Sequence, residues 1–73
     1  MKKYQFPVLI EQDEDGWLVG IVPALKGCHT QARSLPELEK RLKEAIKLCL
    51  AAEKGRVVQN KFMGVHQLEI AMP

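Results

Sequence analysis

Between Ser34 and Lys54, apolar side chains recur at steps of three and four residues, the spacing that places them on one face of an α-helix. Charged residues occupy the opposite face, so the predicted helix is amphipathic and lies on an apolar surface. Ser34 and Glu37 have the spacing of a capping box, and Pro36 stands in the first turn, where a missing N–H costs nothing. Gly55 suits the left-handed conformation that ends a helix. The apolar positions are Leu35, Leu38, Leu42, Ala45, Ile46, Cys49 and Ala52.

The apolar arc of this helix widens near its end. Leu48 and Leu50 extend it on both sides, and Ala51 falls outside it. This pattern indicates a second contact, with the following segment or with another chain. A small domain with a free sheet edge also has reason to bury surface in an oligomer. We therefore expect a homodimer or a higher oligomer, with these three residues as candidate contacts for self-association.

Before the helix, the pattern changes to the period of two that is typical of strands. The first predicted strand alternates from Tyr4 to Glu11, and Pro7 within it requires a bulge or an unpaired edge because proline cannot donate to a ladder. Asp15 and Gly16 then predict a tight hairpin turn. The returning strand covers residues 17–22. One of its faces carries Trp17, Val19 and Ile21, and the other carries Leu18, Gly20 and Val22.

Pro23 closes the second strand, Ala24–Gly27 form a turn, and Cys28–Ala32 form a short third strand. Residues 56–63 have no clear period and indicate a connection. The last predicted strand is Val65–Met72, with a face made of His66, Leu68, Ile70 and Met72. The sequence thus predicts a single α+β domain over residues 1–73, in the order β-β-β-α-β, with one helix on one face of the sheet. The right-handed crossover rule places the last strand beside and parallel to one of the earlier three, most simply the first.

Composition narrows the class of protein. A chain of 73 residues forms one small domain, which buries only about 60% of its unfolded surface. Its net charge of +2 is too small to indicate nucleic-acid binding. No apolar run approaches the roughly 20 residues of a membrane span, and the N-terminus lacks the pattern of a signal peptide. We expect a soluble cytoplasmic protein.

Two groups of residues are candidates for chemical sites. Glu11, Asp13, Glu14 and Asp15 have the side chains that Mg²⁺ prefers, but they lie in and beside one turn, whereas two-metal hydrolysis needs carboxylates from different elements. The hairpin interpretation is therefore favoured. The second group, two cysteines and two histidines, lacks the close pairs of zinc sites and suggests no disulfide in a cytoplasmic protein. Its members are Cys28, His29, Cys49 and His66.

No nucleophile elbow, phosphate loop or dinucleotide fingerprint is present in the sequence. We expect no cofactor, no metal and no enzymatic activity. The basic residues of the helix, Lys40, Arg41, Lys43 and Lys47, alternate with acids, which favours a solvated face over a nucleic-acid site.

The stretch from residue 4 to residue 54 resembles the HicB antitoxin family. The resemblance rests on an N-terminal strand, an acidic hairpin of the D-E-D-G-W type, and the sequence that follows it into the helix. Lys26 stands where a proline is usual and Ala32 where a glycine is usual, and both changes are tolerable at their positions. The matching residues are Pro23, Leu25, Gly27, Cys28, Thr30, Gln31, Ser34, Glu37, Leu38, Ala45 and Ile46.

The resemblance implies a partial ribonuclease-H-like fold that binds and neutralises a small HicA-type mRNA-cleaving toxin. It also implies that the chain, which ends after its last predicted strand, neutralises without a DNA-binding module of its own. Such toxins are usually basic, so the acidic hairpin, Asp13, Glu14 and Asp15, is a candidate for the toxin-facing surface. Trp17 beside it is of a residue type enriched in interface hot spots, although a core position is favoured for it.

Leu25 and Lys26, in the turn after the second strand, are further candidate contacts with the partner. The alternative functions are a divalent-metal nuclease of the ribonuclease-H-like type and a stand-alone oligomeric domain that binds a small ligand or another protein.

Overall fold

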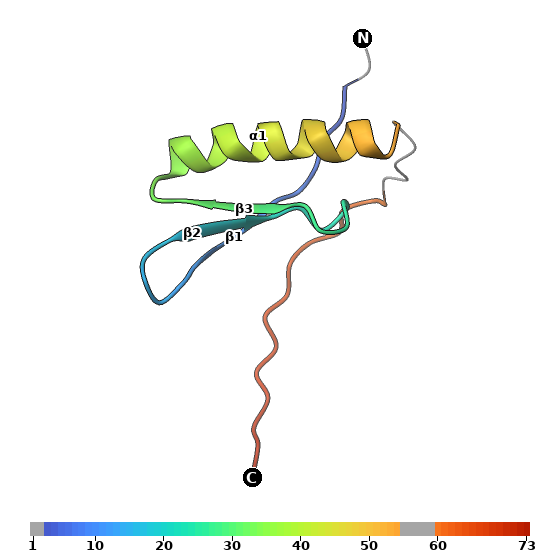
Figure 1. Cartoon of the computed structure of the whole chain (residues 1–73). Coiled ribbons are helices and arrows are strands. Elements are labelled where there is room, and N and C mark those ends of the chain that lie inside the picture. The colour runs from blue at the N-terminus through green and yellow to red at the C-terminus, as the bar shows by residue number, and fades with distance from the viewer. Residues whose placement is uncertain (1–2, 55–59) are drawn as a thin grey trace.

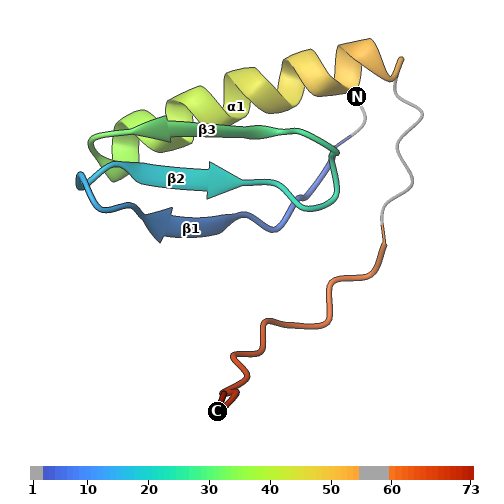
Figure 2. The same cartoon turned by 60° about the horizontal axis from the view of Figure 1, so that its bottom comes forward.

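The computed structural model describes residues 3–54 and 60–73 of the chain. Strands β1 (Leu9–Gln12), β2 (Leu18–Ile21) and β3 (His29–Ala32) precede one helix, α1 (Leu35–Ala52). The strands form an antiparallel sheet in the order β1-β2-β3, and α1 lies along one face of it (Figures 1 and 2). The predicted α+β class and the order β-β-β-α are confirmed.

The strand register separates the two faces of the sheet as the sequence predicts. Ile21 lies opposite both Leu9 of β1 and His29 of β3, and directly opposed residues point to the same face. Gly20, one residue earlier, points to the other face, toward α1. A Cβ atom added at Gly20 would lie only 2.9 Å from Cδ1 of Leu42, so β2 and α1 meet closely where β2 lacks a side chain.

The core lies between α1 and the sheet. Its buried residues come from the end of β2, the following turn, β3 and the first half of α1: they are Val22, Leu25, Cys28, Ala32, Leu38 and Leu42. α1 contacts β3 and β2 but not β1. As a result Ile10 of β1, which points to the helix side opposite Gly20, is 48% exposed. The helix-side face of β1 is therefore only partly covered.

Both ends of α1 use local signals. The Ser34 hydroxyl oxygen accepts a hydrogen bond from the Glu37 amide at 3.4 Å, as the predicted N-cap requires, but the Glu37 carboxylate does not return to the Ser34 amide to complete the predicted capping box. The Glu37 carboxylate pairs with Arg41 one turn later, and Arg41 also donates to the Gln31 carbonyl of β3 at 2.8 Å. At the other end the left-handed residue is Lys54, with φ of 53°, and the predicted Gly55 lies outside the described residues.

The described part of the chain includes no helix that is long and apolar enough to span a membrane. α1 has the required length, but its charged face makes it a helix that covers a sheet.

The first strand is shorter than predicted. β1 begins at Leu9, and the segment before it, including Pro7, has no strand structure. This follows from the missing N–H of Pro7, which cannot donate to a ladder. The preceding aromatic residues pack instead: the rings of Tyr4 and Phe6 stack with centroids 6.0 Å apart.

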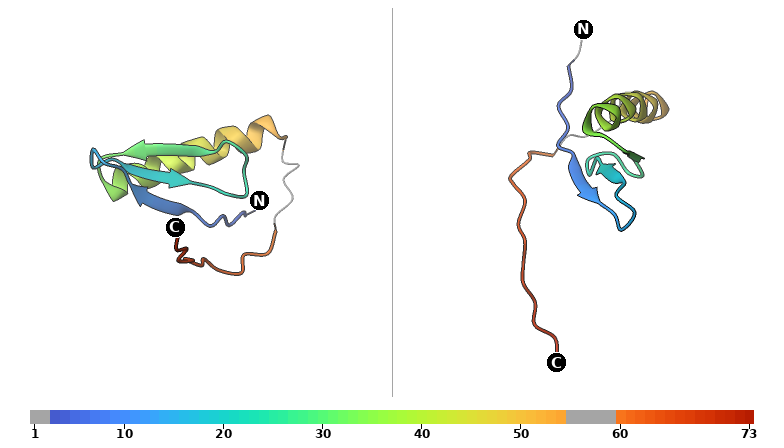
Figure 3. Two further views of the ribbon diagram at one scale, coloured as in Figure 1. Left: turned by 90° about the horizontal axis from the view of Figure 1, so that it is seen from below. Right: turned by 90° about the vertical axis from the view of Figure 1, so that its left-hand side faces the viewer.

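The prediction that Val65–Met72 forms a last strand beside β1 of the same chain is wrong. Residues 60–73 have no strand or helix and leave the domain as an extended segment (Figures 1 and 3). Their side chains are exposed, among them Leu68 at 81% and Ile70 at 75%. The physical reason is that a period of two encodes the faces of a strand but not the neighbour that must accept its backbone hydrogen bonds.

Candidate protein-binding surface

The acidic hairpin between β1 and β2 has a defined structure. The Asp13 amide donates to the Trp17 carbonyl at 2.9 Å, and the Gly16 amide donates to the Asp13 carbonyl at 3.1 Å. The Asp13 carboxylate oxygen Oδ1 accepts from the amides of Asp15 and Trp17, both at 2.9 Å. Gly16 has φ of 85°, the positive value that the sequence predicts for this turn. Asp13 therefore organises the loop, and the Glu14 and Asp15 side chains lie exposed at its tip.

Arg33, at the end of β3, joins the hairpin to the rest of the sheet. Its Nη1 donates to the Asp15 carbonyl at 2.9 Å, and its guanidinium carbon lies 4.0 Å from the centroid of the Trp17 ring. The favoured core position for Trp17 is not what the structure has: the side chain is half-buried and outside the core. The ring instead supports a cation–π contact, which holds the loop and the sheet in one arrangement.

The sequence prediction missed Arg33, although a signal for it existed. Ala32 lies opposite Leu18 in the register, so Arg33 follows opposite Trp17 on the same face. The sequence predicts three antiparallel strands in one sheet but not the register of β2 against β3, which is what brings Arg33 opposite Trp17.

No helix or strand of the described residues covers the face of the sheet opposite α1. Val19 and Ile21 of β2 form its half-buried centre, flanked by Leu9 and Glu11 on β1 and by His29 and Gln31 on β3. Trp17 stands at the hairpin end of this face. An apolar centre with polar and charged neighbours is the composition of a protein-binding patch.

The predicted partner-binding residues do not form one surface. Leu25 and Lys26 lie in the turn after β2, at the opposite end of that strand from the acidic hairpin (Figure 2). Leu25 is 4% exposed and belongs to the core, where the turn holds it through the Cys28 amide, which donates to its carbonyl at 3.0 Å. Lys26 is exposed.

The predicted contacts for self-association divide in a similar way. Leu48 is 72% exposed and Ala51 is also exposed, whereas Leu50 packs partly against the core.

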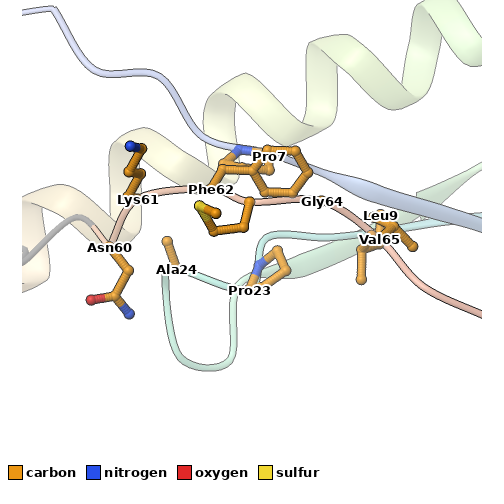
Figure 4. Close-up of a pocket in the computed structure, with 10 residues that line it drawn as sticks. Pro7, Leu9, Pro23, Ala24, Asn60, Lys61, Phe62, Gly64 and Val65 are labelled. Carbon is orange, nitrogen blue, oxygen red and sulfur yellow. The ribbon is translucent and has the colours of Figure 1, made fainter.

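A pocket of about 360 Å³ lies where the C-terminal segment passes the start of β1. Pro7 and Leu9 line it from the N-terminal side, Pro23 and Ala24 from the turn after β2, and residues 60–65 from the C-terminal segment (Figure 4). The lining is mainly apolar and has no paired acid and base. The C-terminal segment therefore passes beside the start of β1 before it leaves the domain.

The two cysteines lie next to each other at the core, but neither histidine joins them. Burial raises the pKa of the Cys28 thiol to about 11, and the neighbouring Cys49 thiol contributes to the same rise. His29 lies on the sheet face away from α1, and His66 lies in the C-terminal segment. Among residues 3–54 and 60–73, no group of three or more His, Cys, Asp or Glu side chains is placed to hold a metal ion.

Several proteins are similar to this chain over most of its length. A UPF0150 protein of Archaeoglobus fulgidus is 52% identical over 66 residues, which cover 90% of this chain and 94% of the relative. A UPF0150 protein of Synechocystis sp. is 40% identical over 70 residues, covering 96% and 100%. A UPF0150 protein of Thermotoga maritima is 33% identical over 66 residues, covering 89% and 88%. No protein-family model matches the chain.

Proposed function

The chain belongs to the UPF0150 family, and we propose that it acts as a protein-binding module that covers and neutralises a small basic ribonuclease, as the HicB antitoxins it resembles do with HicA-type toxins. The observation that carries this proposal is the acidic hairpin, whose tip presents two exposed carboxylates on a loop with a defined backbone.

The hairpin is suited to a cationic partner because its geometry exists before binding. The Asp13 carboxylate is occupied by the loop amides, so it orders the backbone and leaves Glu14 and Asp15 to act as the exposed charges. Arg33 fixes the loop from the sheet side through the Asp15 carbonyl. A pre-organised loop loses less conformational entropy on binding than a flexible one. Exposed acids also accelerate the encounter with a basic protein, an effect that weakens as salt increases.

The uncovered sheet face extends this surface. Trp17 connects the hairpin to the half-buried Val19 and Ile21, so that an apolar patch continues from the acidic tip. A charged rim beside an apolar centre matches the general anatomy of protein interfaces. We assign the toxin-facing surface to the tip and this patch, and we leave the buried Leu25 out of it.

The nuclease alternative requires carboxylates that converge on a pair of metal ions. In the described part of the chain, the acids of the hairpin belong to one turn, and the Asp13 carboxylate accepts two backbone amides. A metal site would require the Asp13 carboxylate to leave the loop amides, whereas partner binding through Glu14 and Asp15 leaves the hairpin as it is. The binding proposal is therefore favoured over the nuclease alternative.

The proposal is tested by affinity purification of the tagged chain from its native host, with mass spectrometry of small co-purifying proteins. The double variant Glu14→Lys/Asp15→Lys serves as a second bait, because it reverses the exposed charges and keeps Asp13. The matched control is Glu39→Lys/Glu44→Lys, which makes the same change of net charge on exposed positions of α1. We expect a basic protein of toxin size with the wild-type chain and the α1 control, and its loss with the hairpin variant.

RNA cleavage by the purified partner provides the decisive measurement. We expect the wild-type chain to inhibit cleavage and the hairpin variant to require at least tenfold more protein for the same inhibition. Equal inhibition by the wild-type chain and the hairpin variant would remove the hairpin from the interface. A partner without RNA cleavage activity would refute the antitoxin function.

A further inference from the structure

The described chain exposes more surface than a compact protein of its size. Its accessible area is 6676 Å². A folded monomer of 8.3 kDa is expected to expose about 4,600 Å². The radius of gyration of 14.3 Å likewise exceeds the roughly 11 Å expected for 73 residues. The excess of about 2,000 Å² in one chain is more than twice the roughly 800 Å² that each partner buries in a standard protein–protein interface.

Much of this excess belongs to the C-terminal segment, Val65–Met72. The segment is extended, and its apolar residues alternate with polar ones, as they do in a strand that covers a core. Three of its apolar side chains are almost fully exposed: Leu68 at 81%, Ile70 at 75% and Met72 at 82%. An apolar face of a segment that no described part of its own chain covers marks an interaction site.

The sheet has an edge that can receive such a segment. The Asp13–Trp17 hydrogen bond identifies the hydrogen-bonded pairs of the β1–β2 ladder, since these pairs alternate along an antiparallel pair of strands. Residues 9 and 11 face β2 with their backbone groups. Ile10 and Gln12 consequently direct their N–H and C=O groups to the outer edge of β1, and no further strand lies there in the described residues.

The other edge of the sheet is less available. The Val22–Cys28 hydrogen bond shows that residues 28, 30 and 32 direct their backbone groups toward β2. Gln31 of β3 therefore directs its carbonyl outward. That carbonyl accepts a hydrogen bond from Arg41 of α1 at 2.8 Å. The helix therefore protects the β3 edge, whereas α1 makes no contact with β1.

Apolar surface also lies on the helix side of the β1 edge. Ile10 is 48% exposed there. Before the start of β1, a groove of about 280 Å³ lies between the N-terminal segment and α1; its lining residues are Tyr4, Phe6, Lys43, Ile46, Lys47 and Leu50. A strand added next to β1 would direct every second side chain to the helix side of the sheet, where Ile10 is exposed, and this matches the alternation of Leu68, Ile70 and Met72 in the segment.

We propose that Val65–Met72 of one chain adds as a fourth strand to the outer edge of β1 in a second copy of the chain, and that the second copy returns its own segment to the first. The reciprocal exchange closes with twofold symmetry and gives a dimer. It covers the exposed edge of β1, gives the extended segment its hydrogen-bond partners, and buries its apolar face. The inference does not depend on the proposed toxin binding.

The test measures molar mass in solution by light scattering and sedimentation, on the full-length chain. The wild-type chain is expected at twice its mass of 8.3 kDa. The variant Leu68→Asp/Ile70→Asp is expected to be monomeric, because it places two charges on the face that packs beside the exposed Ile10 on the helix side of the sheet. The matched control, Gln67→Asp/Ala71→Asp, puts the same charges on the opposite face of the segment and is expected to remain dimeric.

A second variant tests the receiving edge. Ile10→Pro removes an outward N–H without removing a hydrogen bond of the β1–β2 ladder, and it is expected to be monomeric. If circular dichroism finds this variant unfolded, Ile10→Lys, which places a charge at the same edge, replaces it. Mixed in equal amounts, the edge variant and the Leu68→Asp/Ile70→Asp variant are expected to form a 1:1 complex, because one supplies an intact segment and the other an intact edge.

Each alternative result overturns the proposal. A monomeric wild-type chain would mean that the segment pairs with no second copy. A dimer that survives the segment variant would place its interface elsewhere, for example at Leu48 and Ala51. A dimer that survives the edge variant, or monomeric variants that form no mixed complex, would show that the segment binds something other than the β1 edge.

Discussion

Gly20 of β2 provides the sharpest test of how the helix and the sheet fit together. A Cβ atom at this position would lie 2.9, 3.0 and 3.3 Å from three carbon atoms of the Leu42 side chain. Carbon atoms in favourable contact are about 3.5–4.0 Å apart, so the Gly20→Ala variant forces a displacement of up to roughly 1 Å. Leu42 is 5% exposed and has little room to move.

The sign of the stability change is informative, because the loss of backbone freedom on replacing glycine acts in the opposite direction to the steric contact. Replacing glycine by alanine within a strand stabilises by about 0.5–1 kcal/mol when nothing else changes. Overpacking a well-filled core costs about 1–3 kcal/mol. We expect Gly20→Ala to lower the free energy of unfolding by about 1–2 kcal/mol, measured by urea unfolding at constant protein concentration with the fluorescence of the single tryptophan. Unchanged or increased stability would refute the close approach of β2 and α1.

A double-mutant cycle assigns the cost to the Leu42 contact. Leu42→Ala alone should cost about 2–5 kcal/mol, because it leaves a cavity. In the double variant, the methyl group of residue 20 enters that cavity, so the loss should be smaller than the sum of the two single losses by about 1 kcal/mol or more. Leu38→Ala, at a fully buried leucine one turn earlier on α1, is the control and should couple more weakly to Gly20→Ala. Additive losses at Leu42 would refute the assignment.

Three further outcomes concern the hairpin and the core. Asp13→Ala should cost about 1–3 kcal/mol, because two loop amides lose their charged acceptor, whereas Asp15→Asn should change stability by less than about 0.5 kcal/mol; chemical unfolding distinguishes the two. Arg33→Ala should cost about 1 kcal/mol and shift the Trp17 emission to longer wavelength, as the guanidinium leaves the ring. Burial, with a smaller contribution from a neighbouring thiol, raises the pKa of Cys28 from 9.0 to about 11. Between these pH values the folded state keeps a proton that the unfolded state has lost, so the free energy of unfolding should fall as pH rises through this range, and Cys28→Ala should flatten that fall.

The helix and the hairpin were predictable because their signals are local. Ser34 and the three-to-four spacing act within one helix, and the Asp15-Gly16 pair acts within one turn. The boundaries were less predictable because they depend on pairing. The first strand begins at Leu9, after Pro7, and so later than its alternation suggested; Lys54 takes the left-handed conformation after α1, whereas the predicted Gly55 lies outside the described residues.

The candidate site was predictable in charge but not in geometry. The run of acids located the hairpin, yet only the structure separates Asp13, which accepts the loop amides, from the outward Glu14. The burial of Leu25 depends on how the turn after β2 folds back under α1, and no periodicity spans so short a segment. A family resemblance could nominate Leu25 as a contact, but it could not distinguish a core role from a surface role.

The C-terminal segment marks the limit of what a pattern encodes. Alternation at Leu68 and Ile70 indicates that one face of the segment is to be covered, and this information is the same whether the covering sheet belongs to its own chain or to another. The crossover rule assumed its own chain, whereas the structure leaves both the segment and the β1 edge without a strand neighbour in the described residues. Because two complementary unpaired elements occur in one sequence, every copy carries both a donor and an acceptor. Pairing between two copies explains the alternation of the segment without a fourth strand inside the chain. It also places the interface of the predicted oligomer at the β1 edge instead of at the exposed Leu48 of α1.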